Sequence, residues 1–341
     1  MRYLIFRNDR IGDFFITAPL IKSIKRNDLS ANISVVCSEK NIDFVKEIDF
    51  VDNVYIFKDR TLKSRIDLLN KLRKTKFDTI IIADKKNRSL LYGFLIKSKN
   101  KIFNVSKKFH HFFLKFFFKN VFLINDDNNL TNEQNINENL KALNFKFINE
   151  DYTFLHKESF NNVVSFKECF EKNNKNIILH LDEKWDVESY AQIFQKAQYL
   201  TNIQIDKEGL ISFCDKVLTG TNKTVFITTG MTNNTLVETL KNDAKKINDK
   251  IYQFDFENKK IFLVYKADIF SMINLISNCH LMISCHGAFT HVGANFKLEI
   301  FDIIEKRKEN HYKKITSHMK KYKSFYREKF DLLSVKLVNS L

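Results

Sequence analysis

Short apolar runs alternate with helical patterns along almost the whole chain, and this alternation limits the possible fold more than any other feature. In the first third of the chain, apolar runs of β type stand at 3–6, 33–37, 54–57, 79–84 and 101–105. Segments between them, such as "LIKSIKR" and "RIDLLNKLRK", have helical spacing. The runs lack in–out alternation, which is typical of parallel strands covered by helices on both faces.

The second half of the chain repeats the same pattern. Its apolar runs stand at 176–182, 224–230, 261–265, 280–286 and 298–303. We therefore predict an α/β chain of two doubly wound domains. In such folds ligands bind at the carboxyl ends of the strands, and here we expect them in the cleft between the domains.

A chain of 341 residues is too long for one small core, which agrees with two domains. We place an N-terminal Rossmann-like domain at 1–160 and a C-terminal one at 170–315. A helical segment at 316–341 follows and could pack back on the N-terminal domain. Within it, "SHMKKYKSFYREKF" has the pattern of a basic amphipathic helix.

The formal net charge of +16 favours anionic partners such as nucleotides, phosphorylated lipids or nucleic acid. The lysines are spread along the chain and form no basic arm, which argues against nucleic acid. The five scattered cysteines form no Cys-x-x-Cys pair and fit a reducing cytoplasm. We find neither a signal peptide nor a run of about 18 apolar residues, and expect a cytoplasmic protein that is soluble or peripheral on a membrane.

The segment "RNDRIGDFFITAP" follows the first predicted strand and holds the only proline of the chain. Gly12 lacks a Cβ and lets the backbone approach a ligand closely. Asp13 stands near the start of the next helix, where its carboxylate can point into a cleft; alternatively, it only caps that helix. Pro19 marks a helix start or an early kink.

The stretch "RNDRIGDFFITAPLIKSIK" resembles the N-terminal signature of glycosyltransferase family 9, the lipopolysaccharide heptosyltransferases. In that family the first strand runs into an Arg-x-x-x-x-Gly-Asp loop and then a helix with a Thr-x-Pro step. Three later segments resemble further parts of the family in the same order: "IILHLDEKWDVESYAQIF", "VFITTGMTNNTLVETL" and "IFSMINLISNCHLMISCHGAFTHVGANF".

The resemblance implies a GT-B fold, with two Rossmann-like domains facing each other across a cleft. It implies inverting, metal-independent transfer of a heptose-like sugar, from ADP-heptose or another nucleotide-diphosphate sugar, to a lipopolysaccharide, lipooligosaccharide or related surface glycan. Asp13 corresponds to the general base, which a single displacement by a hydroxyl group requires. Arg10 and Gly12 would contact the acceptor. We expect no cofactor and no bound metal.

On the donor side the resemblance points to the ends of several strands in the second domain. A leaving diphosphate without a metal needs positive charge or backbone N–H groups. The expected donor-binding residues are Lys184, Thr229, Gly230, His286, Gly287, Ala288 and His291. Alternatively, Lys184 is a solvated surface lysine and His286 a buried histidine at a strand end. The spacing of Cys285, His286 and His291 fits no metal-ligand motif.

The donor region also departs from the family. His286 stands where the family has Asp, and Gly287-Ala288 replace its Ser/Thr-Gly pair. Lys184 directly precedes Trp185, whereas the family has one residue between them. Asn233 and Asn234 stand where the family tends to have an acidic residue. These changes bear on the identity of the sugar more than on the nucleotide-diphosphate donor.

The segment 107–124, "KKFHHFFLKFFFKNVFLI", carries a phenylalanine stripe flanked by lysines. On a helix, Phe109, Phe112, Phe113, Phe116 and Phe117 lie on one face. Such a helix suits the surface of an anionic membrane, and we expect a peripheral contact with the cytoplasmic face of the inner membrane. The alternative is an ordinary core face.

Two other functions stay open. A degenerate GT-B protein would bind a nucleotide or glycan without catalysis, as the altered donor region allows. A nucleic-acid binder is suggested only by the charge. We expect as partners a nucleotide-diphosphate sugar, preferably an ADP-sugar, and a lipid-linked anionic glycan acceptor, and we expect no nucleic acid.

Overall fold

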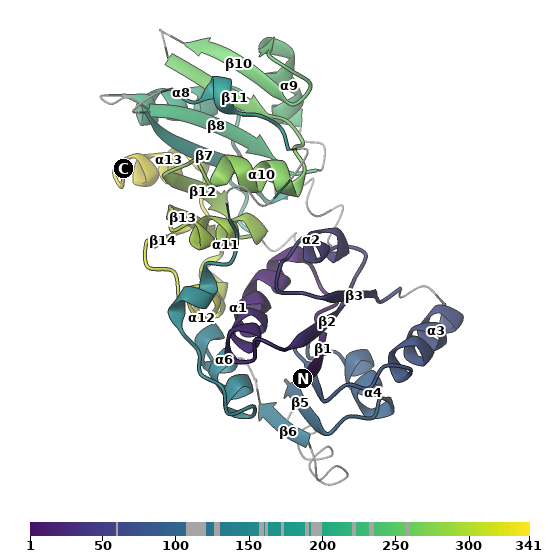
Figure 1. Cartoon of the computed structure of the whole chain (residues 1–341). Helices are drawn as coiled ribbons and strands as arrows, with labels where there is room; N and C mark the ends of the chain where they lie inside the picture. The colour runs from purple at the N-terminus through teal and green to yellow at the C-terminus, as the bar shows by residue number, and fades with distance from the viewer. Residues whose placement is uncertain are drawn as a thin grey trace. The chain divides into compact units, whose positions relative to one another are not determined.

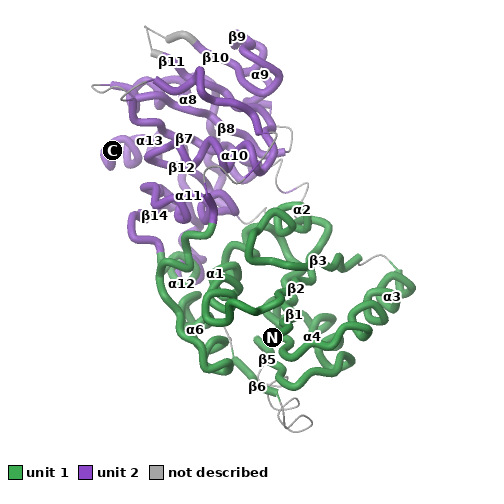
Figure 2. The backbone as a smooth tube through the Cα atoms, in the orientation of Figure 1, with its two compact units in different colours: residues 1–154, 313–318 green, residues 155–312, 319–341 purple. Residues whose placement is uncertain are grey.

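The structure is a computed structural model. It describes residues 1–58, 61–106, 121–125, 130–156, 160, 163–171, 174–187, 191, 200–219, 223–231, 235–256 and 259–341, with the backbone alone for Asp255, Phe256 and Lys259. The chain divides into two compact units (Figure 2). Unit 1 comprises Met1–Phe154 and Lys313–His318, and unit 2 comprises Leu155–Tyr312 and Met319–Leu341.

Unit 1 is built on a parallel six-stranded sheet of order β3-β2-β1-β4-β5-β6. Its strands are β1 (Arg2–Phe6), β2 (Asn32–Cys37), β3 (Asn53–Ile56), β4 (Thr79–Ile82), β5 (Asn100–Val105) and β6 (Val121–Asn125). The first five confirm the strands predicted from the sequence. Residues 121–124 were expected in a helix and instead belong to β6, which pairs with β5. The phenylalanine stripe and the rest of the 107–124 prediction lie outside the described residues.

Helices cover both faces of this sheet (Figure 1). They are α1 (Ile11–Asn27), α2 (Ile42–Lys46), α3 (Leu62–Arg73), α4 (Asn87–Leu95) and α6 (Asn132–Lys141), with a 3₁₀ turn η1 (Asn149–Tyr152). Leu4 and Phe6 of β1 share a buried cluster with Leu72 of α3 and Leu90 of α4. On the other side α1 packs against α6 and η1. The doubly wound arrangement predicted for this half of the chain is confirmed.

Unit 2 has an eight-stranded sheet of order β14-β13-β12-β7-β8-β11-β10-β9. Its strands are β7 (Lys175–Leu181), β8 (Lys223–Thr229), β9 (Lys245–Lys246), β10 (Ile251–Phe256), β11 (Lys259–Val264), β12 (Leu281–Cys285), β13 (Glu299–Ile304) and β14 (Tyr322–Tyr326). Six strands are parallel, and β9 and β10 add an antiparallel edge. Numbered along the chain, the six parallel strands have the same 3-2-1-4-5-6 order as unit 1, so this unit is also Rossmann-like.

Helices also surround the sheet of unit 2 (Figure 1). They are α8 (Lys207–Leu218), α9 (Thr235–Asp243), α10 (Ile269–Ile276), α11 (Ala288–Asn295) and α13 (Phe330–Val338), with 3₁₀ turns η2 (Lys167–Cys169), η3 (Glu183–Trp185) and η5 (Lys306–Lys308). Helix α12 (Glu309–Thr316) begins in unit 2, and its residues from Lys313 onward group with unit 1. The core of the unit includes Trp185, Leu210, Phe213 and Phe330. None of the described helices has the length and apolarity needed to cross a membrane.

The helix predicted for "SHMKKYKSFYREKF" is wrong, because Tyr322–Tyr326 forms β14 at the edge of the second sheet. Phe325 of this strand is buried, and its ring lies 5.1 Å from that of Phe301. The following helix α13 packs on α8, with 5.7 Å between the rings of Phe330 and Phe213. Residues 319–341 therefore belong to unit 2, and of the predicted C-terminal segment only 316–318 group with unit 1.

All five cysteines are free thiols and are buried. Burial raises the pKa of Cys37, Cys214 and Cys285 to about 12 and that of Cys169 to about 11. The thiolate form that reacts with oxidants and disulfides is therefore scarce at neutral pH.

Gly93 of α4 lets this helix lie close to β5. A Cβ at Gly93 would lie 2.7 Å from Cζ of Phe103, which is fully buried and cannot turn away freely. We predict that Gly93→Ala destabilises unit 1 by about 1–2 kcal/mol, because overpacking outweighs the helix propensity that alanine gains. Thermal melting followed by circular dichroism would test this. Leu91→Ala, on the exposed face of α4, is the control, and an unchanged melting temperature in Gly93→Ala would contradict the prediction.

Candidate functional site

In each sheet the strand order reverses beside the first strand of the unit. This switch point lies between β1 and β4 in unit 1 and between β7 and β12 in unit 2. Loops that leave neighbouring strands in opposite directions open a crevice there, where ligands of such sheets bind. The predicted site residues lie at the carboxyl ends of strands near these two points.

In unit 1, a pocket of about 410 Å³ lies at the carboxyl ends of β1 to β4. Arg10 and Asp13 reach it from the segment after β1, as the sequence predicted. Lys40 after β2 and Lys86 and Arg88 after β4 add positive charge. The sequence analysis did not single out these three residues, although each follows a predicted strand.

Asp13 is held at the rim of this pocket by the backbone and by one arginine. Helix α1 begins at Ile11, so Gly12 and Asp13 lie in its first turn rather than in the preceding loop. Oδ2 of Asp13 accepts a hydrogen bond of 3.2 Å from the backbone N–H of Arg10, and Oδ1 lies 3.5 Å from Nη2 of Arg7. The side chain of Asp13 remains 42% exposed. It therefore supports the helix start and also leaves a carboxylate accessible to a ligand.

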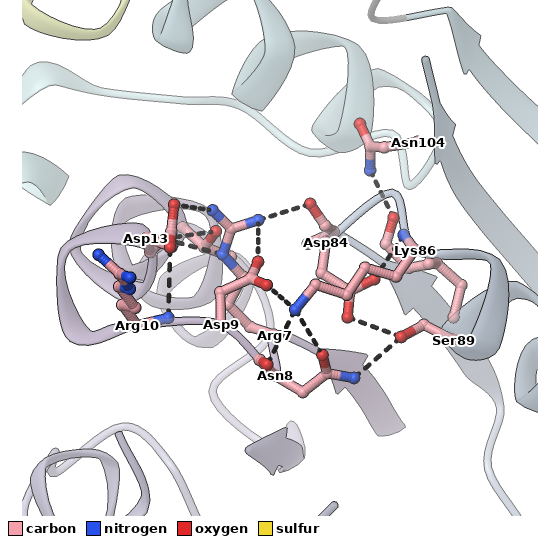
Figure 3. Close-up of polar contacts among 12 residues, drawn as sticks. Arg7, Asn8, Asp9, Arg10, Asp13, Asp84, Lys86, Ser89 and Asn104 are labelled. Carbon is pink, nitrogen blue, oxygen red and sulfur yellow. Dashed lines mark hydrogen bonds and ion pairs between the residues drawn. The ribbon is translucent and has the colours of Figure 1, made fainter. Parts of the chain in front are cut away.

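A polar network connects the loops after β1 and β4 (Figure 3). Lys86 forms an ion pair with Asp9 and donates from Nζ to the backbone carbonyl of Asn8 at 3.0 Å. Ser89 bonds to both Asn8 and Asp84, at 3.0 and 2.6 Å. Burial lowers the pKa of Lys86 to about 8, and neighbouring arginines add to the effect. The network fixes the loop that carries Arg10 into α1.

In unit 2, the turn after β7 contacts the turns after β8 and β12. Lys184 pairs with Asp182 and lies against Gly287, where an added Cβ would lie 3.0 Å from Nζ of the lysine. Gly230 is similarly close to Glu183, whose Oε2 would lie 3.0 Å from an added Cβ. The two glycines, which the sequence predicted as site residues, thus leave room for these side chains.

The charge of Lys184 is set by two opposing effects. Burial on its own would lower the pKa of Lys184, but the Asp182 carboxylate outweighs it and holds this pKa above its usual value. The ammonium is therefore charged at neutral pH and is only 22% exposed. The alternative interpretation of Lys184 as a solvated surface lysine therefore does not hold.

The remaining predicted donor residues surround the turn between β12 and α11. Gly287 caps α11, and its N–H donates to Oγ1 of Thr290 at 3.1 Å, while Ala288 is the first residue of the helix. His291 is buried in α11, with its ring 5.4 Å from that of His286. Thr229 is also buried and accepts a hydrogen bond from the N–H of Lys266 at 2.9 Å. Asn233 and Asn234 lie outside the described residues.

His286 has a partner that the sequence analysis missed. Its Nδ1 lies 2.6 Å from Oδ2 of Asp302 in β13. The signal in the sequence is the acidic residue inside the otherwise apolar run "LEIFDI". Within the described part of the chain, no group of three or more His, Cys, Asp and Glu side chains could hold a metal ion.

Comparison with solved structures identifies the fold. A glycosyltransferase of family 9 from Veillonella parvula superposes with a TM-score of 0.63 at 12% identity, over 99% of this chain and 89% of that chain. E. coli heptosyltransferase WaaC with ADP-2-deoxy-2-fluoro heptose gives 0.63 at 12% identity over all of both chains. E. coli ADP-heptose lipopolysaccharide heptosyltransferase II gives 0.60 at 11%, over 99% and 98%. The chain has the GT-B fold.

The predicted fold class is thereby confirmed, and the resemblance to glycosyltransferase family 9 noted in the sequence is confirmed as a likeness of fold. No protein-family model and no curated protein matches the sequence. At 11–12% identity, the likeness to these structures establishes the fold, while the roles of individual residues stay predictions.

His180 of β7 makes the stability of unit 2 sensitive to acid. Its ring is buried, with Nδ1 2.9 Å from Oγ1 of Thr228, and burial lowers the pKa of His180 to about 4. Below pH 6.5 the unfolded chain gains a proton here that the folded unit does not bind. This histidine therefore costs about 2 kcal/mol of stability between pH 6.5 and 5. We predict that melting temperatures of His180→Gln fall less over this range than those of the wild type. The exposed His311→Gln is the control, and an equal fall in all three would contradict the prediction.

Proposed function

We propose that the chain is an inverting, metal-independent glycosyltransferase. It would move a heptose-like sugar from ADP-heptose, or another nucleotide-diphosphate sugar, to a lipopolysaccharide, lipooligosaccharide or related surface glycan. The observation that carries the proposal is the exposed carboxylate of Asp13 in the pocket of unit 1, in a chain with the GT-B fold. The order of the sequence motifs agrees with this fold.

Asp13 would act as the general base. A single displacement at the anomeric carbon requires the acceptor hydroxyl to lose its proton to a positioned carboxylate. Arg7 and the backbone of Arg10 keep the carboxylate in place, while nearly half of its surface stays open. Arg10, Lys40 and Arg88 around the pocket suit an acceptor with phosphate or carboxylate groups. Gly12 has no side chain, so the first turn of α1 leaves room beside Asp13 for the acceptor.

The donor would bind in unit 2, at the turn between β12 and α11. Lys184 supplies a positive charge there, and the first N–H groups of α11 supply hydrogen-bond donors for a diphosphate. These groups would stabilise the charge that develops on the leaving nucleoside diphosphate. WaaC, which shares this fold, has been solved with ADP, and ADP is therefore the first nucleotide to test.

The alternative of a GT-B protein that binds without catalysis is not favoured, since the pocket of unit 1 presents its carboxylate to solvent. We further propose that the protein contacts the cytoplasmic face of the inner membrane, where a lipid-linked acceptor would lie. The pattern of phenylalanine and lysine residues at 107–119, the part of the predicted segment that precedes β6, supports this contact.

We predict that Asp13→Asn lowers the rate of sugar transfer by a factor of about 10²–10⁴, which is typical of the loss of a general base. Asparagine keeps the shape of the side chain, so folding should change little. The measurement is release of nucleoside diphosphate in the presence of donor and acceptor. Asp43→Asn, another first-turn carboxylate of unit 1, is the matched control. Full activity of Asp13→Asn would rule out its assignment as the base.

We predict that ADP raises the melting temperature of the protein without added metal more than UDP, GDP or CMP does. A ligand at 100 times its dissociation constant stabilises the folded state by about 2.7 kcal/mol.

Lys184→Gln should weaken ADP binding about tenfold, because it removes a charge-assisted contact to phosphate. Lys207→Gln, which removes another paired lysine of unit 2, should have no effect. Stabilisation by UDP or GDP instead of ADP would show that the donor carries a different nucleotide.

A further inference from the structure

His286 and Asp302 form a side-chain pair at the carboxyl edge of the second sheet. Nδ1 of His286 and Oδ2 of Asp302 lie 2.6 Å apart, and the hydroxyl of Tyr322 donates to the same oxygen at 2.8 Å. The three residues come from neighbouring positions in the sheet: the turn after β12, strand β13 and strand β14. Parallel pairing of these strands fixes the geometry of the cluster.

The carboxylate of Asp302 is buried in a way that calls for a positive partner. Asp302 is 0% exposed, and its other oxygen, Oδ1, has no hydrogen-bond partner among the described residues. A buried carboxylate is costly unless a cation compensates its charge. Tyr322 is a neutral donor, so the imidazole of His286 is the contacting group that can supply that charge. An adjacent carboxylate favours the protonated form of an imidazole.

The second ring nitrogen of His286, Nε2, is the one that could contact a ligand, and the side chain is 11% exposed. Nδ1 and Nε2 lie on different sides of the ring, so a ring bonded to Asp302 through Nδ1 directs Nε2 away from it. Within the described part of the chain, no residue forms a hydrogen bond to Nε2. The rings of Tyr312 and His291 lie 4.5 and 5.4 Å from the imidazole, measured between centroids, and limit its rotation.

Other charged and titratable groups near His286 do not replace this cation. They are His291 of α11, Tyr312 of α12, Tyr322 of β14, Lys184 with Asp182 on the turn after β7, and Cys285 with Arg327 and Glu305. The guanidinium of Arg327 donates to Sγ of Cys285 at 3.2 Å and lies 3.7 Å from Oε2 of Glu305, so a carboxylate other than Asp302 already pairs its charge. Burial raises the pKa of Tyr312 to about 12, so this hydroxyl is neutral. Lys184 shares its charge with Asp182, and one charged lysine is therefore partly neutralised before any ligand binds.

We propose that Asp302 is a positioning residue that holds His286 as an imidazolium, and that Nε2–H of His286 donates a hydrogen bond to the diphosphate of the nucleotide-sugar donor. This inference rests on the proposed function. It assigns His286 to the phosphates rather than to the hydroxyl groups of the sugar.

The role of His286 in the transfer is electrostatic, and the reaction needs only the donor and the acceptor. The acceptor oxygen forms a bond to the anomeric carbon and releases its proton to Asp13. The bond from this carbon to the phosphate oxygen breaks, and its electron pair stays on the leaving diphosphate. The imidazolium of His286 stabilises that negative charge and keeps its own proton.

The test is the pH dependence of nucleotide binding, which needs no knowledge of the acceptor. Isothermal titration calorimetry with ADP, and in parallel with UDP and GDP, is carried out at pH 6 and pH 8.5 on the full chain. The variants are His286→Gln and Asp302→Asn, and the control is Asp206→Asn, the cap of α8. The nucleotide titrates identically in every experiment, so the ratio of wild-type to variant affinity isolates the contribution of the protein. Melting curves confirm that each variant is folded.

We expect the wild type to bind about tenfold more tightly than His286→Gln at pH 6, the strength of a charge-assisted hydrogen bond. At pH 8.5 the two should differ by less than about twofold, because a neutral imidazole has lost that charge. At pH 6, Asp302→Asn should bind the nucleotide more weakly than the wild type, because the imidazole of His286 has lost the carboxylate that positions it. Asp206→Asn should match the wild type at both pH values.

Three results would overturn the inference. If the wild type binds a nucleoside diphosphate but its advantage over His286→Gln is the same at both pH values, His286 acts without a charge and the inference alone fails. The same holds if Asp302→Asn behaves as the wild type does. If the wild type binds none of the three nucleotides, the proposed function and the inference fail together.

Discussion

The arrangement of the unit 2 site depends on the burial of Trp185. This indole is 1% exposed, and its Nε1 donates to the backbone carbonyl of His180 at 2.8 Å. Because Trp185 directly follows Lys184, burying the indole fixes the backbone of the lysine. Arg327 holds the same turn from the other side, since its Nη2 donates to the carbonyl of Lys184 at 2.6 Å. The lysine is thus held against Gly287 by hydrophobic burial and two hydrogen bonds rather than by a rigid loop of its own.

In unit 1, buried polar groups hold the loops that carry the site residues in place. Asn8, Ser89 and Asp84 form a buried hydrogen-bonded chain between the loops after β1 and β4. Buried polar groups require partners, so such a chain allows few alternative loop conformations. In both units, therefore, contacts between the loops at the switch point of the sheet hold the site residues in place.

The strands in the middle of both sheets could be predicted because each is a continuous apolar run buried on both faces. Two edge strands could not be predicted, because β6 and β14 are short and half exposed. The aromatic and basic residues of β14 also fit an amphipathic helix, and β6 directly follows a segment with helical spacing. The first residue of α1, Ile11, could not be predicted, because Arg10 is not a typical capping residue. Asp13, Lys184 and His286 could be selected from the sequence, because each lies within a short recognisable motif. Asp302 could not be selected, because its significance depends on a neighbouring strand that brings a histidine within 2.6 Å.

The burial of every cysteine makes site-specific fluorescent labelling of this protein straightforward. Maleimide dyes attach to thiolates, whereas the native thiols are buried, and burial raises the pKa of Cys37, Cys214 and Cys285 to about 12. A cysteine introduced at an exposed position of each unit would therefore be labelled selectively, without first removing the natural ones. A fluorophore pair attached in this way would follow the distance between the two units as a nucleotide binds.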